Sequence, residues 1–136
     1  MKVVLFNGSR REKGCTYTAL NVIVEELKTA GIDSEIVFVG GRVMKGEVEK
    51  VAQYAVENDI DIAFIGPEAP LGKGIVDELQ KNGISCVGPT QSAARIETDK
   101  SFMRKLFEDY EIEGSLVYKV FDNSADVSEF LDEFDR

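Results

Sequence analysis

An apolar run near the start of the chain, Val3 to Phe6, passes into a polar loop and then into a helical pattern. This order constrains the fold more than any other feature. Strand-forming residues without polar alternation are typical of a strand covered on both faces, as in the centre of a parallel sheet. The loop after such a strand lies at the carboxyl edge of the sheet. The opening of the sequence therefore predicts an α/β fold with a loop placed to bind a ligand.

The loop between this strand and the helix is rich in groups that bind anions. Gly8 and Gly14 permit tight turns, several hydroxyl groups are present, and the helix start offers unpaired N–H groups. We therefore expect a phosphate-type anion on the backbone N–H groups of about residues 9–16. The alternative is an ordinary strand-to-helix connection with Thr16 or Thr18 as the helix N-cap. The expected contacts are Ser9, Arg10, Arg11, Gly14, Cys15, Thr16, Tyr17 and Thr18.

The loop has neither of the standard glycine fingerprints. It lacks Gly-x-Gly-x-x-Gly and the Gly-Lys-Ser/Thr ending of a P-loop, so neither a dinucleotide site nor a Walker-type site is indicated. The residues Asn7, Gly8, Ser9, Gly14, Cys15 and Thr16 resemble the FMN-phosphate loop of flavodoxin-like NAD(P)H-dependent FMN reductases and iron–sulfur flavoproteins. This resemblance covers residues 1 to about 40. It implies FMN as the cofactor, or otherwise a phosphate or sulfate ion in the same loop.

Length and charge narrow the function further. A chain of 136 residues predicts a single domain, from residue 1 to 136. Its net charge of −9 disfavours nucleic acid and anionic membranes as partners, so local donors have to hold any phosphate ligand. We expect a small-molecule phosphate ligand and a monomer or weak homodimer. Because the sequence shows no leader with a cleavage site and no long apolar run, we expect a cytoplasmic protein.

The sequence contains no histidine and two cysteines, Cys15 and Cys86, that lie far apart. Histidine-based catalytic triads and histidine metal sites are therefore excluded. The cysteines form neither a Cys-x-x-Cys motif nor a metal-ligand cluster. We predict no catalytic residue and no metal site.

Further along the chain, strand-like runs alternate with helical patterns. Such alternation with right-handed crossovers predicts a flavodoxin-like or Rossmann-like three-layer sandwich. We expect four to five parallel strands in the order 2-1-3-4-5. Leu116 to Phe121 would be an edge strand, and Phe130 and Phe134 of the last helix would cover the sheet. The strands expected after the first one are residues 35–39, 60–65, 84–87 and 116–121.

The second half of the sequence carries different motifs. They are the run from Ile60 to Leu71 that includes Gly-Pro-Glu-Ala-Pro-Leu, then Gly74 to Asp77, Gly88-Pro89-Thr90, and Ala93 to Glu97 with Lys100 and Phe102. From about Val48 to Arg136 the chain resembles the N-terminal region of phosphoribosylamine–glycine ligase, also called glycinamide ribonucleotide synthetase. The resemblance implies a sugar phosphate or a nucleotide as ligand. We do not expect the ligase reaction, because the sequence ends before the ATP-grasp core that carries the ligation chemistry in that family.

Two resemblances in one chain suggest an engineered chimera, joined between about Gly40 and Val48. Two parallel α/β folds can exchange such a fragment when crossover handedness and helix spacing match. The alternative is a natural protein with diverged ends. In the flavin interpretation, the isoalloxazine ring lies beside the loop formed by Pro67, Glu68, Ala69, Pro70, Leu71 and Gly72.

Three functions stay open at this point. The first is a chimeric flavodoxin-like domain that binds FMN or a phosphate-type anion, with little or no catalysis. The second is a non-catalytic N-terminal fragment of the ligase that binds a sugar phosphate or nucleotide. The third is a protein made only to test whether two folds are compatible, with no ligand.

Overall fold

The computed structural model describes residues 1–40, 45–66, 68–124 and 127–133. Pro67, Phe134 and part of the expected junction near residues 40–48 lie outside the described residues. The chain divides into two compact units, Met1–Thr98 and Asp99–Arg136, and each is described by itself. The expectation of a single domain stays a prediction.

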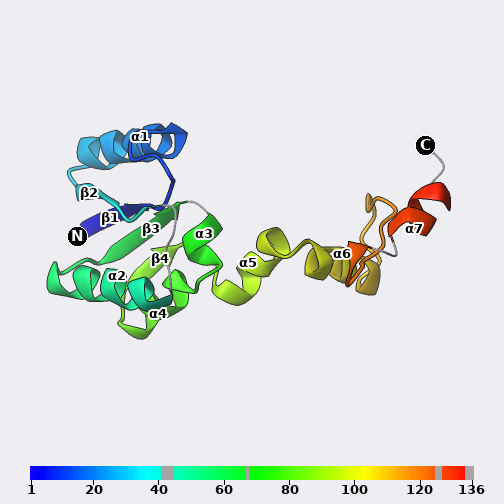
Figure 1. Ribbon diagram of the computed structural model, residues 1–136. Helices are drawn as coiled ribbons and strands as arrows, with labels where there is room; N and C mark the ends of the chain where they lie inside the picture. Colours follow the sequence, from blue (N-terminus) through cyan, green and yellow to red (C-terminus); the bar gives the residue numbers. More distant parts are fainter. Residues whose placement is uncertain (41–44, 67, 125–126, 134–136) are drawn as a thin grey trace. The chain divides into compact units, whose positions relative to one another are not determined.

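Four parallel strands form the sheet of the first unit, in the order β2-β1-β3-β4 (Figure 1). Val3 of β1 lies opposite Ser34 of β2 on one side and Ile62 of β3 on the other, so β1 is central. The predicted α/β class and the order of the first four strands are confirmed. The strands are β1 (Lys2–Asn7), β2 (Asp33–Phe38), β3 (Ile62–Gly66) and β4 (Ser85–Val87).

Helices cover both faces of this sheet and make it the middle of three layers (Figure 1). α1 (Cys15–Thr29) lies on one face, and α2 (Lys45–Glu57) and α4 (Ile75–Lys81) lie on the other. The short α3 (Glu68–Leu71) follows β3, and α5 (Gln91–Thr98) follows β4. Among the helices that the structure describes, none is long and apolar enough to cross a membrane.

The side chains of β1 explain why this strand lies in the centre. Val4 and Phe6 belong to the larger core cluster with residues of α2 and α4, whereas Val3 and Leu5 pack with Leu20 of α1. The side chains of these four residues are all buried. A strand with two covered faces needs apolar residues at successive positions, because neighbouring side chains point to opposite faces.

The second unit contains α6 (Lys100–Asp109) and α7 (Val127–Glu133). The carboxylate of Asp99 caps α6 by accepting a hydrogen bond of 3.0 Å from the Phe102 N–H. No strand is present in residues 115–121, so the predicted fifth strand, Leu116 to Phe121, is wrong. A run of strand-forming residues favours a strand only where a neighbouring edge is available, because β-propensity depends strongly on context.

Candidate functional site

The carboxyl ends of the neighbouring strands β1 and β3 lie side by side, and the connections that follow them leave toward opposite faces of the sheet. From β1 the chain continues to α1 on one face, and from β3 it continues through α3 to α4 on the other (Figure 1). The Gly8 N–H donates a hydrogen bond of 2.8 Å to the Gly66 carbonyl, which ties the first loop to the end of β3. Open parallel sheets bind ligands at such a switch point. The predicted contact residues of the first loop, Ser9 to Thr18, follow β1 at this edge. The second predicted loop, residues 67–72, follows β3, and the structure describes its residues 68–72.

Asn7, the last residue of β1, organises the first loop. Its side chain is fully buried. Its Nδ2 donates to the Glu12 carbonyl at 2.8 Å, and its Oδ1 accepts from the Ser9 N–H at 3.1 Å. These two bonds hold the loop backbone at Ser9 and at Glu12. Our list of site residues lacked Asn7, although an Asn that can accept from the N–H two residues on is a recognisable turn signal.

Within the described ranges of the chain, three backbone donors at the start of α1 have no hydrogen-bond partner. The N-cap is Gly14, in an extended conformation, and no side chain caps the helix. The Thr18 N–H bonds to the Gly14 carbonyl. The N–H groups of Cys15, Thr16 and Tyr17 precede the hydrogen-bonded part of the helix and have no partner among the described residues. The alternative with a threonine N-cap does not hold.

The hydroxyl groups near this helix start differ in availability. Ser9 Oγ donates to the Arg11 carbonyl, and Thr18 Oγ1 donates to the Gly14 carbonyl at 3.3 Å. Thr16 lies against the end of β3, because a Cβ atom on Gly66 would be 3.6 Å from its methyl group. Its hydroxyl has no hydrogen-bond partner in the described part of the chain. Thr16 is therefore the hydroxyl donor with the clearest access to a ligand here.

The loop is locally cationic in an acidic protein. Arg10, Arg11 and Lys13 are exposed and accompany a single carboxylate, that of Glu12. Attraction between these side chains and a phosphate acts over a few ångströms, whereas the diffuse repulsion from the net charge of −9 is screened beyond about 8–10 Å. The structure places all eight predicted residues of this loop on one connection, around the start of α1.

The second predicted loop offers less than the sequence indicated. Pro70 and Leu71 are buried, and Leu71 belongs to the core cluster. Ala69 and Glu68 are exposed, so Glu68 is the polar side chain available to a ligand. The Gly72 carbonyl is already used, because it accepts a hydrogen bond of 3.0 Å from Gln91 Nε2. Packing thus accounts for the apolar members of the loop.

Cys86 does not supply a nucleophile. It lies on β4, and burial raises the pKa of its thiol from 9.0 to about 11. The thiol therefore stays protonated near neutral pH, and only the thiolate is an effective nucleophile or metal ligand. Its Sγ lies 3.6 Å from the Ile84 carbonyl, to which it can donate.

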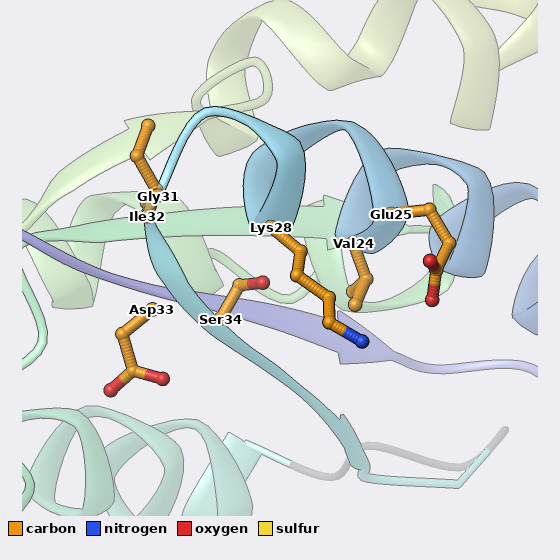
Figure 2. Close-up of a pocket in the computed structure, with 7 residues that line it drawn as sticks. All are labelled: Val24, Glu25, Lys28, Gly31, Ile32, Asp33 and Ser34. Carbon is orange, nitrogen blue, oxygen red and sulfur yellow. The ribbon is translucent and has the colours of Figure 1, made fainter.

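A hollow of about 560 Å³ lies away from this site, where α1 ends and β2 begins (Figure 2). Its charged side chains, Glu25 and Lys28 of α1 and Asp33 of β2, carry both signs and show no convergence on one ligand type. The hollow lies at the amino end of β2, whereas ligands of open parallel sheets bind at the carboxyl ends. We therefore place the candidate site at the loop between β1 and α1.

Comparison with known proteins shows a family match over most of the chain. Residues 3–97 match the family described as Phosphoribosylglycinamide synthetase, N domain. The phosphoribosylamine–glycine ligase of Methanobrevibacter smithii is 86% identical over 92 residues, which are 68% of this chain and 21% of that protein. The ligase of Thermococcus kodakarensis is 38% identical over 150 aligned residues, covering 100% of this chain and 32% of the relative. The chain thus spans about a fifth to a third of the length of these curated relatives.

One solved structure, described as "Solution structure of a phosphate-loop protein", is 17% identical. It covers 88% of this chain and 100% of its own, with a TM-score of 0.43. A similarity this low does not bear on the function.

These matches correct the interpretation of the sequence as an engineered, flavodoxin-like FMN chimera. The family match runs without a break from residue 3 to residue 97, across the expected junction, and a natural ligase aligns with the whole chain. The flavoprotein interpretation rested on a short loop pattern, and glycines with hydroxyl groups recur in many strand-to-helix loops because their backbone chemistry suits anions. The chain belongs to the family of phosphoribosylglycinamide synthetase N domains.

Proposed function

We propose that the first unit serves as the N domain of a phosphoribosylamine–glycine ligase and binds the phosphate of a sugar-phosphate substrate between β1 and α1. The name of the relatives specifies a phosphoribosyl compound. The observation that carries the proposal is the start of α1, which no side chain caps and whose first three N–H groups have no partner among the described residues. Thr16 at this helix start lies against Gly66 at the end of β3. A phosphate dianion is the ligand that such a group of donors favours.

The energetics support a phosphate in this place. Hydrogen bonds to a charged group contribute roughly 1.5–3 kcal/mol each, and the helix dipole adds about 0.3–1 kcal/mol. Three amide donors with the Thr16 hydroxyl can therefore outweigh the diffuse repulsion from an acidic protein. Arg10, Arg11 and Lys13 strengthen the local attraction.

The sugar would extend from the phosphate toward the end of β3. Glu68, exposed at the start of α3, offers carboxylate oxygens that can accept hydrogen bonds from sugar hydroxyl groups. The buried side chains of Pro70 and Leu71, in the same short helix, hold α3 on the core. Glu68 is thus the proposed sugar contact, and α1 carries the proposed phosphate contact.

We assign binding to this stretch and do not assign ligation to it. The chain corresponds to 21% of one relative and 32% of another. Joining an amine to glycine requires activation of a carboxylate, and no residue of the candidate site is arranged to provide it. The proposed role is to hold and orient the phosphorylated substrate for chemistry carried by the larger part of the relatives' length.

A proline substitution at the helix start tests the phosphate site. Cys15 is the first residue of α1, where proline is tolerated, and Gly14 before it is already extended, as a residue preceding proline prefers. Cys15→Pro removes one N–H donor, while Cys15→Ala removes the thiol and keeps the donor. Isothermal titration calorimetry with ribose 5-phosphate should show binding to the parent chain and to Cys15→Ala. Affinity should fall about 10-fold or more in Cys15→Pro, since one charge-assisted bond is lost.

Ribose without phosphate is the matched ligand control and should bind much more weakly. Equal affinity for ribose and ribose 5-phosphate would contradict a phosphate site. So would equal affinity of the alanine and proline variants, provided that far-UV circular dichroism shows both to be folded.

A further inference from the structure

The sequence contains two Asn-Gly pairs, Asn7-Gly8 and Asn82-Gly83. An asparagine that precedes glycine loses its side-chain amide readily, because glycine has no side chain to hinder attack by its own backbone nitrogen. In an unfolded chain the two pairs therefore have the same chemistry. The structure places them in opposite surroundings, since Asn7 is fully buried and Asn82 is exposed.

The loss of the amide is an intramolecular substitution followed by a hydrolysis. The backbone nitrogen of the glycine loses its proton and bonds to the side-chain carbonyl carbon of the asparagine, and the side-chain nitrogen leaves as ammonia. Water then opens the resulting cyclic imide at either of its carbonyl carbons. The product is aspartate, or isoaspartate when the backbone comes to run through the former side-chain carboxyl group. In total, water is consumed, ammonia is released and a carboxylate replaces an amide.

In the folded chain, both reacting groups of the first pair are engaged. The Gly8 N–H, whose nitrogen would attack, donates to the Gly66 carbonyl at 2.8 Å. The Asn7 side chain, which would be attacked, donates to the Glu12 carbonyl at 2.8 Å and accepts from the Ser9 N–H at 3.1 Å. The end of β1 is also paired on both sides, with β2 and β3. These contacts have to break before the nitrogen can reach the amide carbon.

The second pair is held only by its own helix end. Asn82 follows α4, and its Nδ2 donates to the Glu78 carbonyl at 2.9 Å. The Gly83 N–H donates to the Gln80 carbonyl at 3.0 Å. Helix ends fray, and water competes for hydrogen bonds at the surface. Opening at this place does not require two strands to separate.

We propose that Asn7 is a deamidation site that the fold closes. It converts only in chains in which the end of β1 has opened, and the conversion then prevents this end from closing as before. The reaction needs no ligand and is therefore independent of the proposed function. Its co-reactant is water.

Either product is incompatible with the parent's contacts at the end of β1. The aspartate product keeps an acceptor for the Ser9 N–H but sets a carboxylate oxygen against the Glu12 carbonyl. The isoaspartate product adds a carbon to the backbone before Gly8. The pairing of β1 with β3 and the bond from Gly8 to the Gly66 carbonyl then cannot both persist. A converted chain thus carries a permanent mark of an opening event.

The population of opened chains sets the rate at Asn7, because a slow reaction of a state that closes rapidly follows the equilibrium between open and closed forms. Openings at a central strand are much rarer than openings at a surface helix end. Asn7 should therefore convert about 100-fold or more slowly in the folded chain than in the unfolded chain. Asn82 should stay within about 10-fold of its unfolded rate.

Mass spectrometry of peptides from the aged chain measures both conversions in one sample. The whole chain is kept at mildly alkaline pH in buffer, in urea below the unfolding midpoint, and in urea that unfolds it. In the unfolded chain, Asn7 and Asn82 should convert at rates within about threefold of each other, and in buffer Asn82 should be about 10-fold or more faster. Urea below the midpoint should speed conversion at Asn7, because it favours openings that expose buried surface, and should leave Asn82 nearly unchanged.

A substitution in β1 gives the same test without urea. Leu5→Ala removes a fully buried side chain of this strand and should raise the rate at Asn7 about 10-fold or more, with little change at Asn82. Val22→Ala, at an exposed position of α1, is the matched control and should change neither rate. The urea series decides the question if the Leu5 variant does not fold.

Equal rates at Asn7 and Asn82 in buffer would overturn the proposal. So would a rate at Asn7 that does not respond to urea below the midpoint, or no conversion of Asn7 in the unfolded chain.

The converted chains test the second half of the proposal. Ion exchange separates them from the parent, because each has gained a negative charge. Chains converted at Asn7 should unfold at a urea concentration lower by about 1 M or more, whereas chains converted only at Asn82 should stay within about 0.3 M of the parent. Equal midpoints for the two products would contradict the claim that conversion keeps the end of β1 from closing.

Discussion

Replacing Asn7 with alanine should destabilise the first unit far more than removal of an exposed asparagine. Asn7 is fully buried at the end of β1. Its side chain makes two hydrogen bonds, to the Glu12 carbonyl at 2.8 Å and from the Ser9 N–H at 3.1 Å. Each bond contributes about 0.5–1.5 kcal/mol net, and the smaller side chain leaves a void. The expected loss in the free energy of unfolding is about 2–3 kcal/mol.

Asn82 provides the matched control. It is exposed at the end of α4, and its Nδ2 donates one hydrogen bond of 2.9 Å to the Glu78 carbonyl. Water can replace that bond, so Asn82→Ala should cost about 0.5 kcal/mol or less. Asn7→Asp keeps the acceptor for the Ser9 N–H but sets an oxygen against the Glu12 carbonyl. It should therefore be destabilising at neutral pH and less so in mild acid.

Urea unfolding followed by far-UV circular dichroism measures these differences. With a slope of about 1.5 kcal/mol per M, the Asn7→Ala midpoint should fall by roughly 1–2 M. The Asn82→Ala midpoint should stay within about 0.3 M of the parent. Equal shifts for the two alanine variants would refute the reasoning, because they would show that the buried side chain does not hold the loop.

Three further predictions concern the first unit. Burial raises the pKa of Cys86 from 9.0 to about 11, so the folded state favours the protonated thiol. The parent chain should therefore lose stability as the pH rises from about 9 to 11. In urea unfolding, Cys86→Ala should lack this part of the loss. Gly74→Ala should destabilise more than Gly31→Ala in thermal melts. Both glycines have positive φ, which costs about 1–2 kcal/mol for alanine, but only at Gly74 would the new Cβ lie 3.4 Å from Gln91. Leu79→Ala should cost about 2–5 kcal/mol in urea unfolding, because Leu79 is fully buried.

The sequence predicted the sheet of the first unit because its strands are unambiguous. Val3 to Phe6 are apolar at successive positions, which only a strand covered on both faces requires. Residues 62–65 show the same pattern, and both runs are followed by loops that contain glycine. The order of the four strands was taken from the 2-1-3-4-5 arrangement of flavodoxin-like folds and agrees with the sheet.

The errors have physical causes too. Leu116 to Phe121 has the composition of a strand, but composition does not say whether a sheet edge is within reach. Pro70 and Leu71 stood in a loop that looked like a binding site, and only the structure shows them buried. Asn7 was missed as a site residue although its turn signal can be read from the sequence, because the burial of its side chain cannot.

Titration of ¹⁵N-labelled chain with ribose 5-phosphate, followed by NMR, tests the proposed phosphate site most directly. If the phosphate binds at the start of α1, the amide signals of Cys15, Thr16 and Tyr17 should shift together and saturate. Inorganic phosphate should shift the same three amides, and ribose should leave them in place. Shifts that instead fall on Asp33 and Ser34, beside the hollow at the end of α1, or no saturable shift anywhere, would contradict the proposed function.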